Sequence, residues 1–162
     1  MKELKIESKF IVYDSLKETS KGVQDLMRKA IQVRDNAYAP YSKFNVGAAL
    51  LLENGVVITG SNQENASYPS GLCAERTAIY YAGAQYPDVK ILEIAISATS
   101  KNTPTKDPIP PCGACRQAIS EYEVKQNTPI SIYFMGESGK VVKSNSLANL
   151  LPWVFDRSEE RR

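Results

Sequence analysis

The feature of this 162-residue chain that most restricts its fold and chemistry is its set of three cysteines together with the absence of histidine. An odd number of cysteines argues against a disulfide framework and favours a reducing compartment. Because there is no histidine, serine triads, cysteine–histidine dyads and all other imidazole catalysis are excluded. Any zinc site must therefore use cysteine or carboxylate ligands, which the fold has to bring together.

The composition is that of a globular protein, with 43% hydrophobic and 23% charged residues. A formal net charge of +2 is too small to favour a nucleic-acid or membrane partner. The first seven residues are charged and lack the apolar core of a signal peptide, and no apolar run approaches the ~18 residues of a membrane span. We therefore expect a cytoplasmic protein that binds neither nucleic acid nor membranes.

The spacing of apolar residues predicts strands that alternate with helices. Asn54-Gly55 lies between two apolar runs and is a strong hairpin signal. This order favours an α/β fold, here a three-layer α-β-α sandwich with one mixed sheet of about five strands. The expected helices cover residues 21–37, 73–84, 112–121 and 146–151, and the expected strands cover residues 45–52, 56–61, 91–99, 129–135 and 140–143, with a weaker strand signal over residues 4–12.

A chain of this length is expected to form one domain, residues 1–162, around a single core. Residues 1–20 form an N-terminal extension, and residues from about 21 to 156 form the core that carries the chemistry. Residues 157–162 are expected to be a frayed tail, because Glu159 and Glu160 interrupt its run of arginines.

The cysteines form a pattern typical of a catalytic zinc site. Cys112 and Cys115 are three residues apart, so at the start of a helix they share one face and can bind one ion. Cys73 precedes another predicted helix and supplies a third thiolate. Three protein ligands leave one position for water, which distinguishes a catalytic site from a structural one, and they predict one Zn²⁺ per chain. Glu75, two residues after Cys73, is placed to handle protons beside that water.

The charge of this site predicts a further residue. Three thiolates and one Zn²⁺ sum to −1, so positive groups are needed to keep bound water acidic. Two helix N-termini, each equivalent to about half a positive charge, point at the metal if the helices begin at Cys73 and Cys112. Arg76 follows Glu75 and is expected to donate hydrogen bonds to the sulfur atoms.

With these motifs in place, the sequence resembles the small cytidine deaminases of pyrimidine salvage. The resemblance extends from about residue 37 to residue 155, nearly three-quarters of the chain, and implies their α/β fold. Zinc deaminases use the same signature, a glutamate beside the first ligand and a Pro-Cys-x-x-Cys run. The shared stretches are residues 39–49, 62–69, 73–78, 111–117 and 150–152.

The resemblance implies a nucleoside pocket beside the zinc. Asn62 and Glu64 correspond to the pair that binds the ribose hydroxyls, and Phe44 to the aromatic wall near the base and sugar. The Ala74 N–H and the Pro110 carbonyl correspond to the groups that meet the base oxygen and the amino group. A flat base needs such apolar faces and a few convergent polar groups.

The resemblance also implies a homotetramer whose sites include residues from neighbouring subunits, and Tyr68 and Phe155 match such positions. Three features depart from the family pattern. Ser67 stands where many members carry another cysteine, the first ~20 residues exceed the compact pattern, and the proline-rich loop before Cys112 is longer.

The implied reaction is the hydrolytic deamination of cytidine and 2′-deoxycytidine to uridine and 2′-deoxyuridine, with release of ammonia. Water activated by the zinc attacks C4 of the cytosine, and Glu75 takes its proton and returns protons to N3 and the leaving ammonia. Both nucleosides are candidate substrates, since a pocket that binds the 3′-hydroxyl tolerates either group at C2′.

Three other functions are considered. A deaminase of an aminated nucleoside analogue, similar to blasticidin-S deaminase, shares Cys-Ala-Glu, but residues 62–65 together with Tyr68-Pro69 favour cytidine deaminases. A nucleic-acid editing deaminase usually carries His-x-Glu and needs a basic channel. A zinc-stabilised scaffold without turnover does not need the open fourth position or Glu75.

Overall fold

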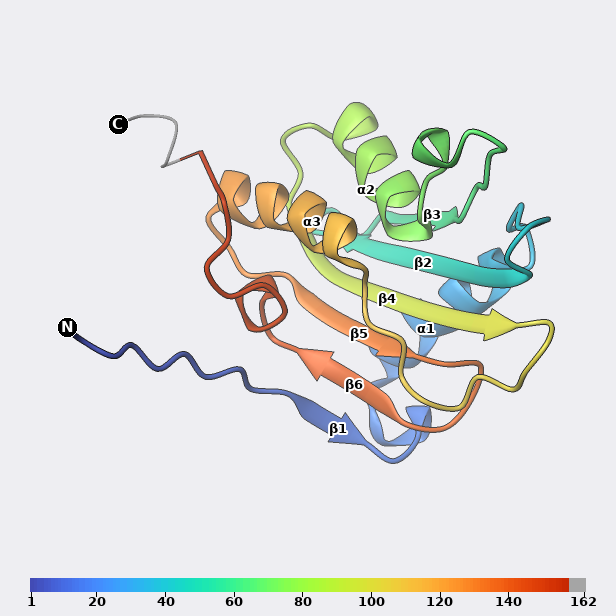
Figure 1. The fold of residues 1–162 in the computed structure, drawn as a ribbon, viewed down its shortest axis with the longest axis horizontal. Coiled ribbons are helices and arrows are strands. Elements are labelled where there is room, and N and C mark those ends of the chain that lie inside the picture. The colour runs from blue at the N-terminus through green and yellow to red at the C-terminus, as the bar shows by residue number, and fades with distance from the viewer. Residues whose placement is uncertain (158–162) are drawn as a thin grey trace.

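The computed structural model describes residues 1–157 and contains one six-stranded sheet with helices on both faces (Figure 1). The strand order is β1-β6-β5-β4-β2-β3. β4 and β5 are parallel and the other neighbouring strands are antiparallel, so the sheet is mixed. The strands are β1 (Ile11–Tyr13), β2 (Phe44–Leu52), β3 (Val57–Ser61), β4 (Ile91–Ser100), β5 (Ser131–Met135) and β6 (Val141–Ser144).

Helix α1 (Lys21–Arg34) covers one face of the sheet, and α2 (Ala74–Gln85) and α3 (Gly113–Gln126) cover the other (Figure 1). The Ser20 hydroxyl accepts a hydrogen bond from Val23 N–H and so caps α1. Each face has its own apolar core, because alternate residues of the buried strands point to opposite sides. Single-turn 3₁₀ helices occur at Leu16–Glu18, Tyr68–Ser70 and Leu147–Asn149.

Two glycines allow helices to lie directly against the sheet. A Cβ atom on Gly60 of β3 would lie 2.7 Å from the carbonyl oxygen of Ala74, the first residue of α2. A Cβ atom on Gly47 of β2 would lie 2.0 Å from the Ala30 oxygen in α1, on the other face. The backbones of both helices therefore approach closer than any side chain permits.

The predicted α/β class is confirmed, but the prediction of about five strands is wrong by one. The sixth strand, β1, comes from the segment where residues 4–12 gave a weak strand signal, and it covers only Ile11–Tyr13. Ile11 lies opposite Lys143, near the end of β6, so residues 4–10 extend past the available partner and form no ladder.

The other predicted elements differ from the structure mainly at their ends. The helix predicted over residues 112–121 continues to Gln126, where Asn127 adopts a left-handed conformation with φ of 49° and ends it. The last predicted helix is a single 3₁₀ turn, capped by Ser146. Apart from Arg157, the tail predicted over residues 157–162 lies outside the described residues. Among the described residues, no helix is both long and apolar enough to cross a membrane.

Candidate active site

The fold brings all three cysteines together at the starts of two neighbouring helices. Cys73 is the N-cap residue of α2 and Cys112 is the N-cap residue of α3, while Cys115 lies in the first turn of α3. Neither N-cap side chain caps its own helix. The free N–H groups and the positive ends of both helix dipoles therefore face the three sulfur atoms and stabilise negative charge on them.

The sulfur positions fit a tetrahedral zinc ion. The Sγ atom of Cys112 lies 3.7 Å from that of Cys73 and 3.4 Å from that of Cys115, and all three lie within 4.8 Å of one another. Ligands at a Zn–S distance of ~2.3 Å in tetrahedral geometry are separated by about 3.8 Å. The chemistry of the donors and their spacing thus match a metal site with three protein ligands.

Glu75 lies beside this cluster in the first turn of α2 and is 4% exposed. Burial raises the pKa of the Glu75 carboxyl to about 7, with a smaller contribution from the nearby Cys73 sulfur. A carboxyl group with a pKa near neutrality can both take up and release a proton during a reaction.

Arg76 places positive charge against the same sulfur atoms. Its Nη2 atom donates a hydrogen bond to Cys73 Sγ at 3.6 Å, and its Nε atom is buried without a hydrogen-bond partner among the described residues. Hydrogen bonds from the Cys115 thiol and then from Arg76 lower the pKa of Cys73 to about 5, although burial opposes this shift. Cys73 is thus prepared to act as a thiolate.

A cavity of about 780 Å³ opens directly onto Cys73, Cys112 and Glu75. This volume lies within the range of small-molecule sites. The wall combines apolar side chains from the sheet and loops with a smaller polar surface. The remaining wall consists of Tyr41, Ser42, Phe44, Val46, Asn62, Gln63, Glu64, Asn65, Tyr68, Gly71, Leu72, Arg76, Ile96, Ile109 and Pro110.

Glu64 organises the loop before β2. Its Oε2 atom accepts hydrogen bonds from the backbone N–H groups of Tyr41 and Ser42, at 2.9 and 3.3 Å, and its Oε1 atom accepts one from the Ser42 hydroxyl. The Ser42 hydroxyl in turn accepts a hydrogen bond from Phe44 N–H at 3.1 Å. These contacts, led by the Ser42 hydroxyl, lower the pKa of Glu64, so it carries a negative charge at the cavity.

Asn62 holds the start of β2, which follows this loop. Its Oδ1 atom accepts a hydrogen bond from Val46 N–H at 2.7 Å, and its Nδ2 atom donates one to the Phe44 carbonyl at 2.9 Å. The backbone of Phe44 is thereby fixed by Asn62 and by Ser42, so its ring has a defined place in the cavity wall.

The comparison with known families agrees with this geometry. Residues 20–129 match the family model described as the cytidine and deoxycytidylate deaminase zinc-binding region. The match covers two-thirds of the chain and includes all three cysteines and Glu75. The chain belongs to this deaminase family. Its members are zinc-dependent deaminases, hydrolases that act on C–N bonds, and this is the class of enzyme to which the chain belongs.

Relatives and solved structures give the same result for almost the whole chain. A cytidine deaminase of Halalkalibacterium halodurans is 42% identical over 132 residues, which is 82% of this chain and 92% of the relative. One from Mycobacterium tuberculosis is 39% identical over 143 residues, 85% of this chain and 94% of the relative. The crystal structure of a cytidine deaminase from Burkholderia pseudomallei superposes with a TM-score of 0.70 at 36% identity, covering 85% of this chain and all of the other.

Two of the deaminase residues expected in the pocket lie outside this wall. Ala74 is fully buried as the first residue of α2 and is not part of the cavity wall. Phe155 is 61% exposed, and its carbonyl accepts a hydrogen bond from Gln117 Nε2 at 2.8 Å on the outer side of α3. Tyr68 stands at the rim of its own chain's cavity and is 76% exposed.

Among the wall residues that were not assigned a role from the sequence, Tyr41 and Ser42 contact residues that were. Tyr41 packs edge-to-face against Tyr68 with ring centroids 6.1 Å apart, and Ser42 bridges Glu64 and Phe44. Both lie in the shared stretch 39–49, so the sequence marked the segment. Their roles depend on Glu64 and Tyr68, more than twenty residues away in the chain, which no local pattern reveals.

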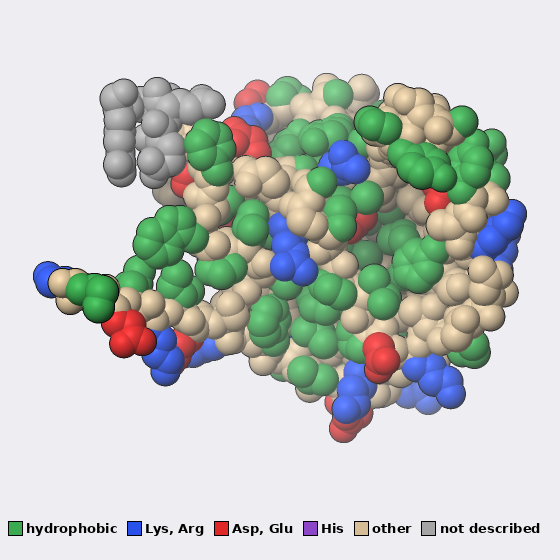
Figure 2. Space-filling model, in the orientation of Figure 1, with side chains coloured by type: hydrophobic (Ala, Val, Ile, Leu, Met, Phe, Trp, Pro, Cys, Tyr) green, Lys and Arg blue, Asp and Glu red, His purple; other side chains and the backbone are tan. Residues whose placement is uncertain are grey.

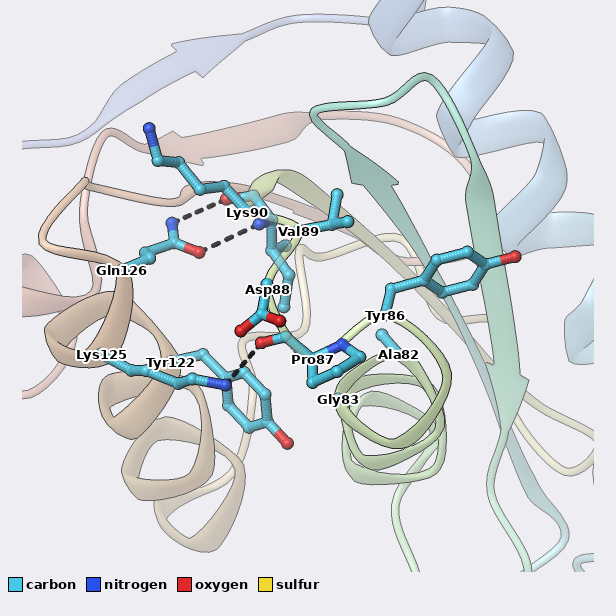
Figure 3. Close-up of a pocket in the computed structure, with 11 residues that line it drawn as sticks. Ala82, Gly83, Tyr86, Pro87, Asp88, Val89, Lys90, Tyr122, Lys125 and Gln126 are labelled. Atoms are coloured by element: carbon cyan, nitrogen blue, oxygen red, sulfur yellow. Dashed lines mark hydrogen bonds between the residues drawn. The ribbon is translucent and has the colours of Figure 1, made fainter.

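A second cavity, of about 190 Å³, lies at the opposite ends of α2 and α3 (Figure 3). Three of its polar side chains, those of Lys125, Gln126 and Lys90, make local contacts. Lys125 Nζ donates to the Pro87 carbonyl at 2.6 Å, and the Gln126 side chain bonds both the N–H and the carbonyl of Ile91. Lys90 pairs with Glu53 at 3.5 Å. This cavity therefore offers structural bonds between the helix ends and the sheet rather than a second set of reacting groups.

Proposed function

We propose that this deaminase converts cytidine and 2′-deoxycytidine to uridine and 2′-deoxyuridine with release of ammonia, in pyrimidine salvage in the cytoplasm. The observation that supports this most directly is the position of the buried Glu75 carboxyl beside three converging thiols at the end of a nucleoside-sized cavity. We further propose one Zn²⁺ per chain and a catalytic core over residues 21–156 of a single domain.

Cys73, Cys112 and Cys115 are the residues that would hold the zinc. When bound, zinc supplies a Lewis acid that makes water nucleophilic near neutral pH. Glu75 is the proton carrier: its carboxylate takes a proton from the attacking water and delivers protons to N3 of the base and to the departing amine. The overall change adds water at C4 and removes ammonia, so the glutamate ends in its starting state.

Arg76 and the helix N-termini offset the negative charge of the three thiolates. Arg76 donates directly to Cys73 Sγ, and the first N–H groups of α2 and α3 face the cluster. Donors of this kind orient the ligands and reduce their electron donation to the metal. The thiolate cluster is therefore compatible with acidic bound water.

The hydrogen-bonding capacity left on Asn62 and Glu64 supports recognition of a sugar hydroxyl. A side-chain amide has two donor hydrogens and two acceptor lone pairs, and Asn62 already uses one of each. A carboxylate accepts about four hydrogen bonds, and Glu64 already accepts three. One donor on Asn62 and about two acceptor positions, one on each residue, remain for a sugar, and we assign them to the 3′-hydroxyl, which is present in both nucleosides.

The base is proposed to lie between Phe44 and the cysteine cluster. Pro110 lies in the cavity wall and its carbonyl can accept from the exocyclic amino group. The Ala74 N–H belongs to the first turn of α2, where N–H groups have no partner within the helix, and can donate to the base oxygen. The Pro110 carbonyl would distinguish the amino group of cytosine from the oxygen of uracil, and the Ala74 N–H would fix the other end of the ring.

We also propose a homotetramer with shared sites, in which Tyr68 and Phe155 reach neighbouring subunits. Their exposed fractions, 76% and 61%, are large for aromatic residues, which supports burial against another chain. A Tyr68→Ala subunit mixed with a Glu75→Gln subunit would then regain activity in hybrid tetramers. Absence of regained activity in confirmed hybrids would contradict sharing of Tyr68.

Ammonia release from a panel of substrates tests the proposed function. We expect turnover of cytidine and 2′-deoxycytidine with kcat/KM values within about tenfold of each other, a difference of ~1.4 kcal/mol. Single-stranded oligonucleotides are expected to be inactive. Turnover of an aminated nucleoside antibiotic without turnover of cytidine would move the enzyme to that neighbouring class of deaminases.

A further inference from the structure

The N-terminal arm, residues 2–10, lies outside the matched family region and projects beyond the sheet. Figure 1 shows it leaving β1 as an extended segment, and Figure 2 shows hydrophobic and charged side chains along it. A hydrogen bond from Lys9 N–H to Asn149 Oδ1, at 3.0 Å, ties its end to the body. The family match begins at residue 20, so the deaminase site does not account for this arm.

The arm has one apolar face. In an extended chain alternate residues share a face, and Leu4, Ile6, Phe10 and Val12 all have even numbers. Their exposed fractions are 67%, 49%, 42% and 56%, so the face is open to solvent in the isolated chain. An exposed row of this kind indicates a contact surface rather than a solvated tail.

The opposite face carries charges that alternate in sign: Glu3, Lys5, Glu7 and Lys9. The side chains of Lys5 and Glu7, two residues apart, form an ion pair with an N–O distance of 2.8 Å, as expected for an extended segment. Such a sequence repels a parallel copy of itself in register, because each charge meets its like. An antiparallel copy can instead place opposite charges together.

The backbone next to the arm has a free edge. Within residues 1–157, β1 is the outermost strand of the sheet and pairs with β6 on one side only. Lys9 N–H points toward the body, so in the extended arm the backbone groups of its even-numbered neighbours point away from it. Unpaired strand edges are ready templates for another strand.

We propose that the arm pairs antiparallel with the arm of a second copy of this chain, with Ser8 opposite Ser8. This register places Ile6 opposite Phe10 and Leu4 opposite Val12 on the apolar face. On the other face it places Glu7 opposite Lys9, while Lys5 faces Ile11 and Glu3 faces Tyr13. Val12 belongs to β1, so the partner's arm continues the six-stranded sheet instead of forming an isolated two-stranded ribbon, which is only marginally stable in water.

Other registers are less favourable. A shift that places Glu7 opposite Glu7 also places Lys5 opposite Lys9, so like charges meet. A register centred on Ile6 keeps opposite charges together but sets Leu4 against Ser8 and leaves the arm short of the partner's β1. Among these three, the Ser8 register alone pairs the apolar residues with one another and sets no like charges together.

Disulfide trapping in the full-length, zinc-loaded protein tests this register. Facing residues of an antiparallel pair have Cα atoms ~4.5–5.5 Å apart, within the span of a disulfide. We expect Ser8→Cys to form a disulfide between two chains under mild oxidation. The Ile6→Cys variant should not, because its two copies would lie roughly 13 Å apart. The unsubstituted chain controls for Cys73, Cys112 and Cys115, and peptide mapping identifies the linked residue.

Charge reversal gives a second measurement in the Ser8→Cys background. Adding Glu7→Lys should lower the linked fraction at least about threefold, and Glu7→Lys with Lys9→Glu should restore it, because opposite charges face each other again. No link through Ser8→Cys would overturn the pairing, and stronger linking through Ile6→Cys would overturn the register. An equal link in all three charge variants would show that charge complementarity does not direct the contact.

Discussion

The position of α2 against β3 leads to a sharp expectation for Gly60→Ala. The new Cβ atom would lie 2.7 Å from both the Ala74 oxygen and the Ala78 nitrogen, and 3.1 Å from the Ala78 Cβ atom. Two of these atoms are backbone, so the first turn of α2 has to retreat by roughly 0.5–1 Å to reach ordinary van der Waals separation. That turn carries Glu75 and follows Cys73, so the retreat moves the metal site itself.

The size of the effect follows from two tolerances. Overpacking of this kind costs about 1–3 kcal/mol of folding free energy, which lowers the Tm of a domain of this size by roughly 2–12 °C. Metal sites tolerate changes of about 0.2 Å in ligand distance, less than the expected displacement of Cys73. We therefore expect Gly60→Ala to lose both stability and zinc affinity.

Calorimetry and competition with a chromophoric zinc chelator measure these two effects. Gly47→Ala is the matched control: its Cβ atom meets α1 at 2.0 Å on the other face, so it should lose stability while its zinc affinity stays near that of the native protein. Gly22→Ala lies in α1, and no atom lies within 4 Å of its new methyl group. It should leave zinc affinity unchanged and should not lower stability, because alanine favours a helix over glycine by about 0.5–1 kcal/mol. Equal zinc affinity in the Gly60→Ala and Gly47→Ala proteins would refute the idea that Gly60 positions the site.

Two substitutions separate metal binding from substrate binding. Arg76→Ala should lower zinc affinity or activity by about 10–100-fold, because it removes the hydrogen bond to Cys73 Sγ. Arg28→Ala, on the surface of α1, is the control and should lower neither. Unchanged zinc content and rate in the Arg76→Ala protein would show that Arg76 has no role in the site. Ser42→Ala should raise the KM for cytidine by roughly tenfold with little change in kcat, because Glu64 loses a hydrogen bond while Glu75 is untouched. Ser42→Thr keeps the hydroxyl and should recover most of the lost affinity. A drop in kcat at unchanged KM would contradict this role for Ser42.

The cluster of three cysteines could be predicted because its information is local. Cys73 and Glu75 are two residues apart, and Cys112 and Cys115 are three apart. Each motif stands at the start of a helix that the local sequence predicts. Once the starts of α2 and α3 are adjacent, the distances between the three Sγ atoms can vary little. The absence of a fourth cysteine or any histidine then indicated an open coordination position.

The sheet order could not be predicted, because it depends on pairing between distant segments. β4 lies between β2 and β5 in the sheet. β3 separates β2 from β4 in the chain, and the parallel pair β4 and β5 is joined by a crossover through α3. The weak strand signal over residues 4–12 was wrong for residues 4–10, since strand pairing needs a partner as well as a pattern. A pattern in one segment carries no information on where the neighbouring strand ends.

The organisation of the pocket wall was also hidden from the sequence. The family resemblance predicted that Glu64 binds sugar hydroxyls, but the structure shows that three of its acceptor positions are used by Tyr41 and Ser42. These contacts join residues 22 and 23 positions apart. They leave about one acceptor position on Glu64 for a sugar hydroxyl, a limit that becomes visible only when its partners are known.

The most direct test of the proposed reaction compares the native protein with Glu75→Gln, measuring ammonia release from cytidine and zinc content for both. Loss of a general acid–base group costs about 10²–10⁴ in rate, and we expect the upper end because Glu75 handles several proton transfers. The variant should still hold about one zinc per chain, since its three sulfur ligands are intact. Turnover near the native rate in a zinc-loaded Glu75→Gln protein would contradict the role of Glu75 as proton carrier.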